Sequence, residues 1–336
     1  MTAGRRWPGI VIAVALALAP GVSLSGENPS APASGAPLTF AIVPKLLDNP
    51  VFNYARVGAE KRARQIGNIR ILWRAPQEAD AAKQVEIIES LIAMKVDGIA
   101  VSCNEPEALR GVIDKAIAAG IPTITFDSDA PKSRRLTYYG VNDLECGRLL
   151  GEALARETKG KGEVAMLTGM RGAFNLETRM EGVREALRRH PGMALVQTVA
   201  CDDDTAKSVS QIEGVMKARP ALAGWAFVGG WPLFARGALD PVDAKRTAVV
   251  SWDALPPEWP YLEGGKVRLL LAQRVFHWGV ESVNLLVAAA KGVRLPRNSY
   301  SGVDLVTPGN LAAYRRMWTR WEDPAIPFGR DPLLKP

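Results

Sequence analysis

Carboxylate, amide and aromatic side chains recur in this sequence where apolar runs end. Asp127 and Asp129 follow the run PTITF, and Asp253 closes the run AVVSWD. Carboxylates and amides hydrogen-bond to hydroxyl groups, and aromatic rings stack on the apolar faces of saturated rings. The mixture therefore predicts a site for a small polyhydroxylated compound. The candidate ligand-binding residues are Lys45, Asn49, Phe52, Ser102, Asp127, Asp129, Asn175, Glu177, Trp231, Asp253 and Gln273.

Several of these candidates also have a structural interpretation. An aspartate after a strand, such as Asp127 or Asp253, can cap a helix or shape a turn. Asn49 precedes a proline and could shape the chain there. Phe52 could pack in the core, and Lys45 could be an exposed surface lysine. Both interpretations stay open on the sequence alone.

The tryptophans and the residues near position 177 raise the same question. We expect that Trp231, Trp252 and Trp278 do not all line one pocket, so that at least one belongs to the core. Glu177 could face a ligand, or it could form an ion pair with the nearby Arg179.

The sequence lacks the motifs of several enzyme classes. No nucleophile elbow, HExxH motif, P-loop or Cys-x-x-Cys is present. Clustered carboxylates could act as a glycosidase pair or bind Ca²⁺, but we expect neither catalysis nor a cofactor or metal ion. His190 and His277 are too few for a histidine-rich metal site. We expect Cys103, Cys146 and Cys201 to be buried thiols, with a Cys103–Cys146 disulfide as the alternative.

The elements that would position these residues alternate between strand and helix. Strands are predicted at 39–43, 69–73, 98–102, 122–126 and 136–141, with helices at 51–66, 79–94 and 106–118. The alternation starts again near residue 163, with strands at 164–169, 194–200, 223–230, 248–253 and 268–273 and helices at 174–189, 204–218 and 275–291. Continuously apolar runs such as IAVS are typical of buried parallel strands. The pattern predicts a doubly wound α/β fold, and the restart favours two lobes over a single large sheet.

Length and composition agree with an ordinary globular protein. At roughly 100–200 residues per domain, 336 residues make one large domain or two ordinary ones. The chain is 47% hydrophobic and 23% charged, which argues against a disordered, fibrous or polytopic membrane protein. The net charge of +7 comes from mixed signs and is a weak signal for nucleic acid, so we expect no such partner.

The first residues have the layout of a secretory signal peptide. Arg5 and Arg6 precede an apolar run at about 10–19, and Ser23 and Ser25 suit the −3 and −1 positions of a cleavage site. The run is shorter than the roughly 20 residues that span a bilayer, although a retained anchor is the alternative. We expect a signal peptide at 1–25, a flexible leader at 26–37 and a protein of the periplasm.

Five segments resemble the sugar-binding family of type I periplasmic binding proteins, which includes ribose, rhamnose and autoinducer-2 receptors. They are AIVPKLLDNPVFNYARVGAEKRARQIG, DGIAVSCNEPEALRGVIDKAIAAGIPTITFDSDA, YYGVNDLECGRLLGEAL, VVSWD and LLLAQ. The resemblance covers about residues 38–306. It implies two doubly wound parallel-sheet lobes of the α/β class, joined by a three-crossing hinge near 141–143, 273–274 and 301–302.

The resemblance also implies lobe boundaries. We expect an N-terminal lobe of 38–142 plus 274–301, a C-terminal lobe of 143–273 plus 302–318, and a C-terminal tail at 319–336. The start of the segment 310–336 is expected to be helical, with Leu311, Tyr314 and Trp318 spaced to pack on a lobe.

Residue by residue, the resemblance assigns roles in a ligand site. It implies that Asp127 and Asp253 grip ring hydroxyls, that Asn49 is a first-loop amide, that Phe52 stacks on the ligand and that Gln273 is a hinge glutamine.

The other candidates depart from the family's patterns or fit one branch of it. Ser102 stands where ribose binders place an amide, and Lys45 fits the autoinducer-2-like branch. Glu177 stands where ribose binders place an arginine. Asn175 and Leu176 stand where the autoinducer-2-like branch has an acid followed by an amide. Trp231 lies where an amide is expected. The resemblance therefore implies an acidic and tryptophan-rich pocket.

The function implied by the resemblance is that of a monomeric solute receptor. Such a receptor captures a monosaccharide, another small polyol or an autoinducer-2-like compound by hinge closure, and delivers it to an inner-membrane ABC permease. Two alternatives stay open. The protein could serve a chemoreceptor or sensor kinase, or it could bind an amine or aromatic ligand, which Glu177 would favour.

Overall fold

The computed structural model describes residues 36–323 and residue 325. The predicted signal peptide at 1–25, nearly all of the predicted leader and most of the predicted tail lie outside these residues. Within the described part of the chain, no helix has both the length and the apolar character needed to cross a membrane.

The N-terminal lobe is built on a six-stranded sheet, ordered β11-β5-β4-β3-β1-β2, in which every pairing is parallel. The strands are β1 (Leu38–Val43), β2 (Ile69–Trp73), β3 (Gly98–Val101), β4 (Thr123–Phe126), β5 (Tyr138–Gly140) and β11 (Asn298–Tyr300). The helices are α1 (Pro50–Ile66), α2 (Ala81–Ala93), α3 (Pro106–Ala118) and α8 (Val275–Ala290). Strands β3 and β4 are buried throughout, as their continuously apolar sequences predict.

The C-terminal lobe repeats this plan on a second six-stranded sheet, ordered β12-β10-β9-β8-β6-β7. Its strands are β6 (Gly162–Thr168), β7 (Met193–Ala200), β8 (Gly224–Phe227), β9 (Ala248–Trp252), β10 (Leu269–Gln273) and β12 (Val303–Val306). Its helices are α4 (Asp143–Glu157), α5 (Phe174–Arg188), α6 (Thr205–Ala218) and α7 (Trp259–Glu263), with 3₁₀ turns at Trp231–Phe234 and Pro256–Glu258. Only β12 runs antiparallel to its neighbour, β10, among the strand pairs of the described residues.

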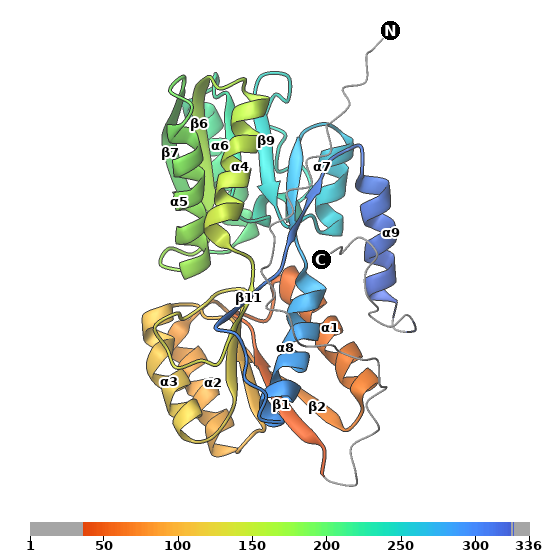
Figure 1. Cartoon of the computed structure of the whole chain (residues 1–336). Coiled ribbons are helices and arrows are strands. Elements are labelled where there is room, and N and C mark those ends of the chain that lie inside the picture. Colours follow the sequence, from red (N-terminus) through yellow and green to blue (C-terminus); the bar gives the residue numbers. More distant parts are fainter. Residues whose placement is uncertain (1–35, 324, 326–336) are drawn as a thin grey trace, which may run out of the picture.

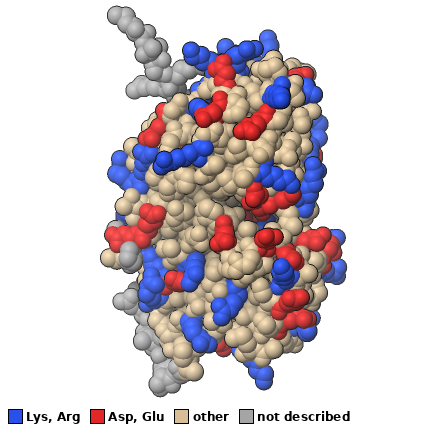
Figure 2. All heavy atoms as spheres, turned by 180° about the vertical axis from the view of Figure 1, so that it is seen from behind, with Lys and Arg blue, Asp and Glu red and all other residues tan. Residues whose placement is uncertain are grey.

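The chain passes between the lobes three times, and Figure 1 shows the two lobes stacked around these crossings. It crosses from β5 to α4, from β10 to α8, and from β11 to β12. The fold is therefore two doubly wound lobes joined by a three-crossing hinge, as predicted. On the face shown in Figure 2, basic and acidic side chains are interspersed.

Side-chain caps set the starts of four helices. Asn49, Asp80, Asn142 and Asp204 each accept a backbone N–H from the first turn of α1, α2, α4 and α6. Caps of this kind stabilise a helix by roughly 1 kcal/mol. They explain why the predicted helices at 79–94 and 204–218 begin one or two residues later in the structure.

Helices α4 and α5 pack closely because glycines lie at their contact. A Cβ atom on Gly147 would stand 2.0 Å from the carbonyl oxygen of Arg179, and one on Gly182 would stand 2.2 Å from that of Leu144. Any larger side chain would push the helices apart. This contact fixes the position of α5, whose first turn reaches the space between the lobes.

Four elements were missed by the prediction from sequence, and the last helix is longer than predicted. Helix α4 was not among the predicted helices, and neither were strands β11 and β12 or the five-residue helix α7. Strands β11 and β12 are short and only partly buried, so they lack the continuously apolar run of the buried strands. Helix α9 (Leu311–Glu322) runs past residue 318, where we expected the C-terminal lobe to end. Leu311, Tyr314 and Trp318 are buried as their spacing predicts.

Candidate functional site

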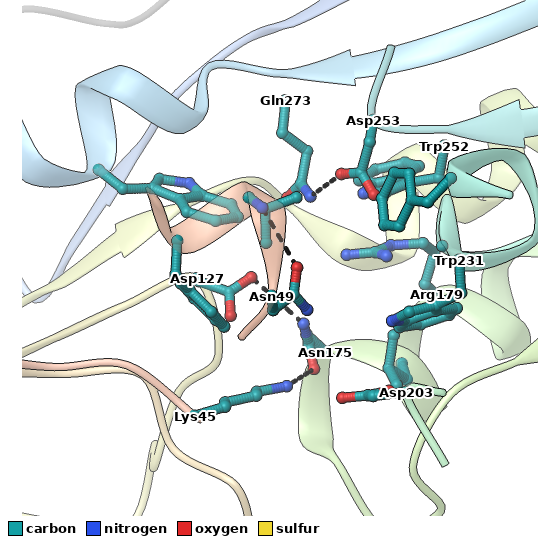
Figure 3. A pocket seen from close by; sticks show the side chains of 16 residues that line it. Lys45, Asn49, Asp127, Asn175, Arg179, Asp203, Trp231, Trp252, Asp253 and Gln273 are labelled. Carbon is teal, nitrogen blue, oxygen red and sulfur yellow. Dashed lines mark hydrogen bonds between the residues drawn. The ribbon is translucent and has the colours of Figure 1, made fainter. Parts of the chain in front are cut away.

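A cavity of about 40 Å³ lies between the two lobes. It lies at the carboxyl ends of strands in both sheets, which is where open parallel sheets bind their ligands. Figure 3 shows the side chains that line it. The lining residues are Lys45, Asn49, Val51, Phe52, Asp127, Asn175, Leu176, Arg179, Asp203, Gly229, Trp231, Phe234, Trp252, Asp253, Gln273 and Trp278.

Asp127 faces the cavity from the end of β4 in the N-terminal lobe. Asp127 is 6% exposed, and Ser102 Oγ donates a 2.6 Å hydrogen bond to its Oδ2. The Tyr138 hydroxyl donates to the main-chain oxygen of Asp127 at 2.9 Å. Ser102 does not line the cavity. It lies behind Asp127 and orients the carboxylate, a role that the sequence did not reveal.

Asp253 faces the cavity from the end of β9 in the C-terminal lobe. Gln273 Nε2 donates to its Oδ1 at 2.9 Å, and the Gly230 N–H donates to its Oδ2 at 3.1 Å. Burial raises the pKa of Asp253 to about 6, although the hydrogen bond from Gln273 acts in the opposite direction. Two neutral donors thus hold the carboxylate, and no cation neutralises it by direct contact among the described residues.

Both aspartates have left-handed backbone conformations, with φ of 57° at Asp127 and 85° at Asp253. For a residue with a side chain this conformation costs roughly 1–3 kcal/mol. Such strain is typical of functional positions, where the surrounding structure enforces it. Here it turns each carboxylate from the end of its strand into the cavity.

The first turn of α5 brings Asn175 and Arg179 to the cavity but not Glu177. Residues four apart in a helix share a face, whereas a residue two positions on points about 200° away. Glu177 is therefore exposed, and its Oε1 accepts the Gly172 N–H at 3.1 Å. The structure does not place Glu177 at the cavity, and the argument for an amine ligand that relied on it loses its basis.

Asn175 connects the lobes directly. Lys45 Nζ, from the loop after β1, donates to Asn175 Oδ1 at 3.0 Å. Asn175 Nδ2 lies 3.5 Å from Asp127 Oδ1. One amide of the C-terminal lobe thus contacts two charged side chains of the N-terminal lobe across the cavity (Figure 3).

Arg179 is held rigidly at the cavity wall. Its guanidinium donates to Asp143 Oδ1 at 2.7 and 3.1 Å and lies 3.7 Å above the Trp252 ring. The ion pair is buried, with 2% and 6% of the two side chains exposed. Burial raises the pKa of Asp143 to about 6, and the charge of Arg179 partly offsets this shift. Arg179 lines the cavity while its charge is paired with Asp143.

Asp129 lies outside the cavity because an arginine binds it. Arg135 Nε and a terminal nitrogen of the same guanidinium each donate to the Asp129 carboxylate at 2.5 Å, and Thr125 Oγ1 donates at 2.6 Å. This ion pair is buried within the N-terminal lobe. The structure therefore gives Asp129 a structural environment, not a place at the cavity.

An aromatic wall forms one side of the cavity. The Phe52 ring lies 6.0 Å from that of Trp278, and both residues are also part of the core. Trp231 and Trp252 border the cavity as well. The expectation that the three tryptophans cannot share one pocket was wrong, because wall and core are continuous here. Trp252 and Trp278 serve both, at 1% exposure each.

Asn49 and Gln273 also combine a local role with a place at the cavity. Asn49 Oδ1 accepts the Val51 N–H at 3.2 Å and caps α1, which leaves its amide nitrogen on the cavity side. Gln273 ends β10 at the hinge, and its hydrogen bond to Asp253 aligns both side chains.

Sequence reasoning missed Asp203 and Arg179, and it left Trp252 and Trp278 undecided. Helical periodicity from Asn175 would have found Arg179. Asp203 is the middle of three consecutive aspartates, and nothing in their spacing separates it from its neighbours.

The described residues contain no group of three or more His, Cys, Asp or Glu side chains arranged to hold a metal ion. Cys103, Cys146 and Cys201 are free, buried thiols. Burial is the first cause that raises the pKa of each thiol.

Comparison with known proteins places this geometry among solute receptors. Residues 40–293 match the family model described as periplasmic binding protein domain. The ribose import binding protein of Escherichia coli is 25% identical over 259 residues, covering 76% of this chain and 86% of its own length. The D-apiose import binding protein of Actinobacillus succinogenes is 25% identical over 260 residues, covering 76% and 82%.

A solved structure shows the same likeness at higher identity. It is an ABC transporter solute-binding protein from Burkholderia graminis, in complex with D-arabinose. Its chain is 34% identical to this one, with a TM-score of 0.78, and the match covers 84% of this chain and 99% of that chain.

Proposed function

The chain belongs to the periplasmic binding protein domain family, and on that premise we propose that it is the sugar-binding protein of an ABC importer. In this function it captures a monosaccharide or a closely related cyclic polyol between its lobes. It binds the ligand without transforming it.

The observation that carries the proposal is the pair of buried carboxylates that face one cavity from opposite lobes. Asp127 and Asp253 both accept hydrogen bonds from neutral groups and both retain acceptor capacity toward the cavity. Sugar hydroxyls are the donors that suit them, and each such bond to a charged group contributes roughly 1.5–3 kcal/mol. The tryptophan and phenylalanine rings supply surfaces for the apolar face of a sugar.

Closure of the hinge follows from the placement of these groups. Asn49, Asp127 and Lys45 belong to one lobe, and Asp253 and Gln273 reach the cavity from the other sheet. A ligand contacts both sets at once only when the lobes are close together. The closed state is therefore favoured by the ligand contacts that it alone permits.

The setting of this function follows the family. We place the mature protein in the periplasm after removal of the segment at 1–25, and its partner is the permease of an inner-membrane ABC importer. The related proteins are named for ribose and D-apiose, and the solved structure holds D-arabinose. These three sugars form the first panel to test.

Titration by intrinsic tryptophan fluorescence tests the proposal, since three tryptophans border the cavity. We expect at least one of D-ribose, D-apiose and D-arabinose to saturate the signal at one site per chain. Asp253→Ala should weaken that binding by about 1.5–3 kcal/mol, the contribution of a hydrogen bond to a charged group.

Asp240→Ala is the matched control, because Asp240 is an exposed aspartate of the same lobe. It should leave the affinity unchanged. An Asp253→Ala variant with wild-type affinity would remove Asp253 from the site. Native mass spectrometry of protein purified from its own host would identify a sugar outside the panel, and a co-purified amine or lipid would contradict the sugar assignment.

A further inference from the structure

Two opposite charges face each other at one end of the cavity. Lys45 enters from the N-terminal lobe, and Asp203, from the turn between β7 and α6, enters from the C-terminal lobe (Figure 3). Lys45 is 4% exposed, and its ammonium donates to the neutral Asn175 amide at 3.0 Å. Within residues 36–323, neither Lys45 nor Asp203 forms an ion pair.

Asp203 is aimed at the cavity by its surroundings. Asp202 and Asp203 both have left-handed backbone, with φ of 52° and 61°. Asp202 forms an ion pair with Lys207, and Asp204 caps α6, so only the middle aspartate of the three turns inward. The Met170 N–H donates to Asp203 Oδ1 at 2.9 Å and fixes one carboxylate oxygen.

Gly169, which directly follows β6 in the same lobe, leaves space for this carboxylate. A Cβ atom on Gly169 would stand 1.9 Å from Asp203 Oδ1 and 2.6 Å from the Trp231 ring. Only glycine fits there, so the local structure accommodates both Asp203 and Trp231 at the cavity.

The other charged side chains that line the cavity each have a partner within their own lobe. Arg179 is paired with Asp143, and neutral donors hold Asp127 and Asp253. Burial raises the pKa of Asp203. The charge of Lys45 is the largest influence that opposes this shift, so the two groups attract each other electrostatically.

Resting on the sugar-binding function above, we propose that Lys45 and Asp203 form a charge filter that selects neutral sugars. A sugar hydroxyl both accepts and donates, so one hydroxyl group can accept from the Lys45 ammonium and donate to the Asp203 carboxylate. An ammonium group on the ligand meets Lys45 as a like charge, and a carboxylate group meets Asp203 as one. Like charges brought together in an interface cost several kcal/mol.

The filter is complete only in the closed state, because its two members belong to different lobes. A ligand of either charge therefore meets the opposing member as the lobes approach. Selection therefore occurs as the lobes close, because only a neutral hydroxyl can hydrogen-bond to both Lys45 and Asp203.

Removing one member should change which charge is accepted. Lys45→Met leaves Asp203 unopposed and should shift the ratio of affinities toward D-glucosamine over the neutral sugars by about tenfold or more. Asp203→Asn leaves Lys45 unopposed and should shift the ratio toward D-glucuronate by a similar factor. The double variant Lys45→Met/Asp203→Asn should prefer neutral sugars again, with a weaker affinity.

Competition against the three neutral sugars, followed by tryptophan fluorescence, measures these ratios. Asp202→Asn makes the same substitution one residue away and should leave them unchanged. Circular dichroism and thermal unfolding establish that each variant is folded, and Lys45→Gln replaces any Lys45→Met protein that is not.

Two results would overturn the filter while leaving sugar binding intact. One is a wild-type protein that binds D-glucosamine or D-glucuronate more tightly than any neutral sugar. The other is an unchanged preference in both single variants. A wild-type protein that binds neither the neutral panel nor the charged sugars would overturn the sugar-binding function, and the filter with it.

Discussion

Asp253 is placed to bind a ligand, and this placement lowers the stability of the protein. Its carboxylate is buried, its backbone is left-handed, and its partners are neutral. Burial raises its pKa from 3.8 to about 6, so the native state holds a proton there between about pH 4 and pH 6 that the unfolded state has released. The contribution of Asp253 to the free energy of unfolding therefore falls as the pH rises through that window, and it stays low at higher pH.

Replacing this carboxylate by its neutral isostere should stabilise the protein while weakening sugar binding. We expect Asp253→Asn to raise the unfolding free energy at pH 7 by about 1–3 kcal/mol, because one pKa unit corresponds to about 1.4 kcal/mol. The gain should shrink as the pH falls toward 4, where Asp253 of the wild-type protein is protonated. Urea unfolding without sugar at several pH values measures this, and a variant less stable than wild type at pH 7 would contradict the argument.

Residues of the site were predictable from sequence to the extent that strand ends determine them. Asp127 and Asp253 directly follow buried strands, so the sheet itself brings them to the cavity. The prediction for Glu177 failed because the rotation of α5 about its axis decides which residues of its first turn face the cavity. Asp203 was not predicted, because no periodic pattern distinguishes it from Asp202 and Asp204. The conformation of the turn, with left-handed backbone at two positions, decides which of the three aspartates faces the cavity.

At the scale of elements, α9 joins parts of the molecule that the predicted lobe boundaries had kept apart. The Trp318 ring lies 4.8 Å from Tyr54 of α1, 5.1 Å from Phe276 of α8 and 6.0 Å from Trp259 of α7. Buried Lys61 of α1 donates to carbonyl groups at the end of α9, including that of Trp321 at 3.2 Å. Helix α9 therefore packs on both lobes beside the hinge (Figure 1).

Truncating the central side chain of α9 should destabilise the whole protein. Trp318 is 1% exposed, and replacing a buried tryptophan by alanine typically costs about 3–5 kcal/mol. We expect Trp318→Ala to lower the unfolding free energy in urea by an amount in that range. Arg316→Ala, on the exposed side of the same helix, is the control and should change it little. Equal stabilities of the two variants would show that the Trp318 side chain does not stabilise the fold.

The elements themselves were predictable where the hydrophobic pattern is long. Helix α3 has the predicted bounds, and strands β3 and β4 each differ from prediction by one residue at one end. The pattern of α9 was visible, but its partners were not, because its partners are aromatic residues far away in the sequence. Contacts of that kind depend on how the two lobes are arranged.

At the scale of the whole molecule, the cavity is small for the proposed ligand. About 40 Å³ accommodates only a few water molecules, each of which needs roughly 10–15 Å³. A monosaccharide must therefore separate the lobes slightly or displace the cross-lobe contacts. The bonds from Lys45 to Asn175 and from Asn175 to Asp127 hold the closed arrangement through the protein's own side chains.

Removing these cross-lobe bonds should shift the ligand-free protein toward the open state. If they favour closure by about 1–2 kcal/mol, their loss in Asn175→Ala raises the ratio of open to closed molecules by a factor of roughly 5–30. Small-angle scattering should then give a larger radius of gyration for ligand-free Asn175→Ala than for ligand-free wild type. Glu177→Ala, on the outer side of the same helix, should match wild type. At saturating sugar all three proteins should converge on one compact value, because the ligand then supplies the contacts across the hinge. Identical ligand-free values for Asn175→Ala and wild type would mean that the amide does not hold the lobes together.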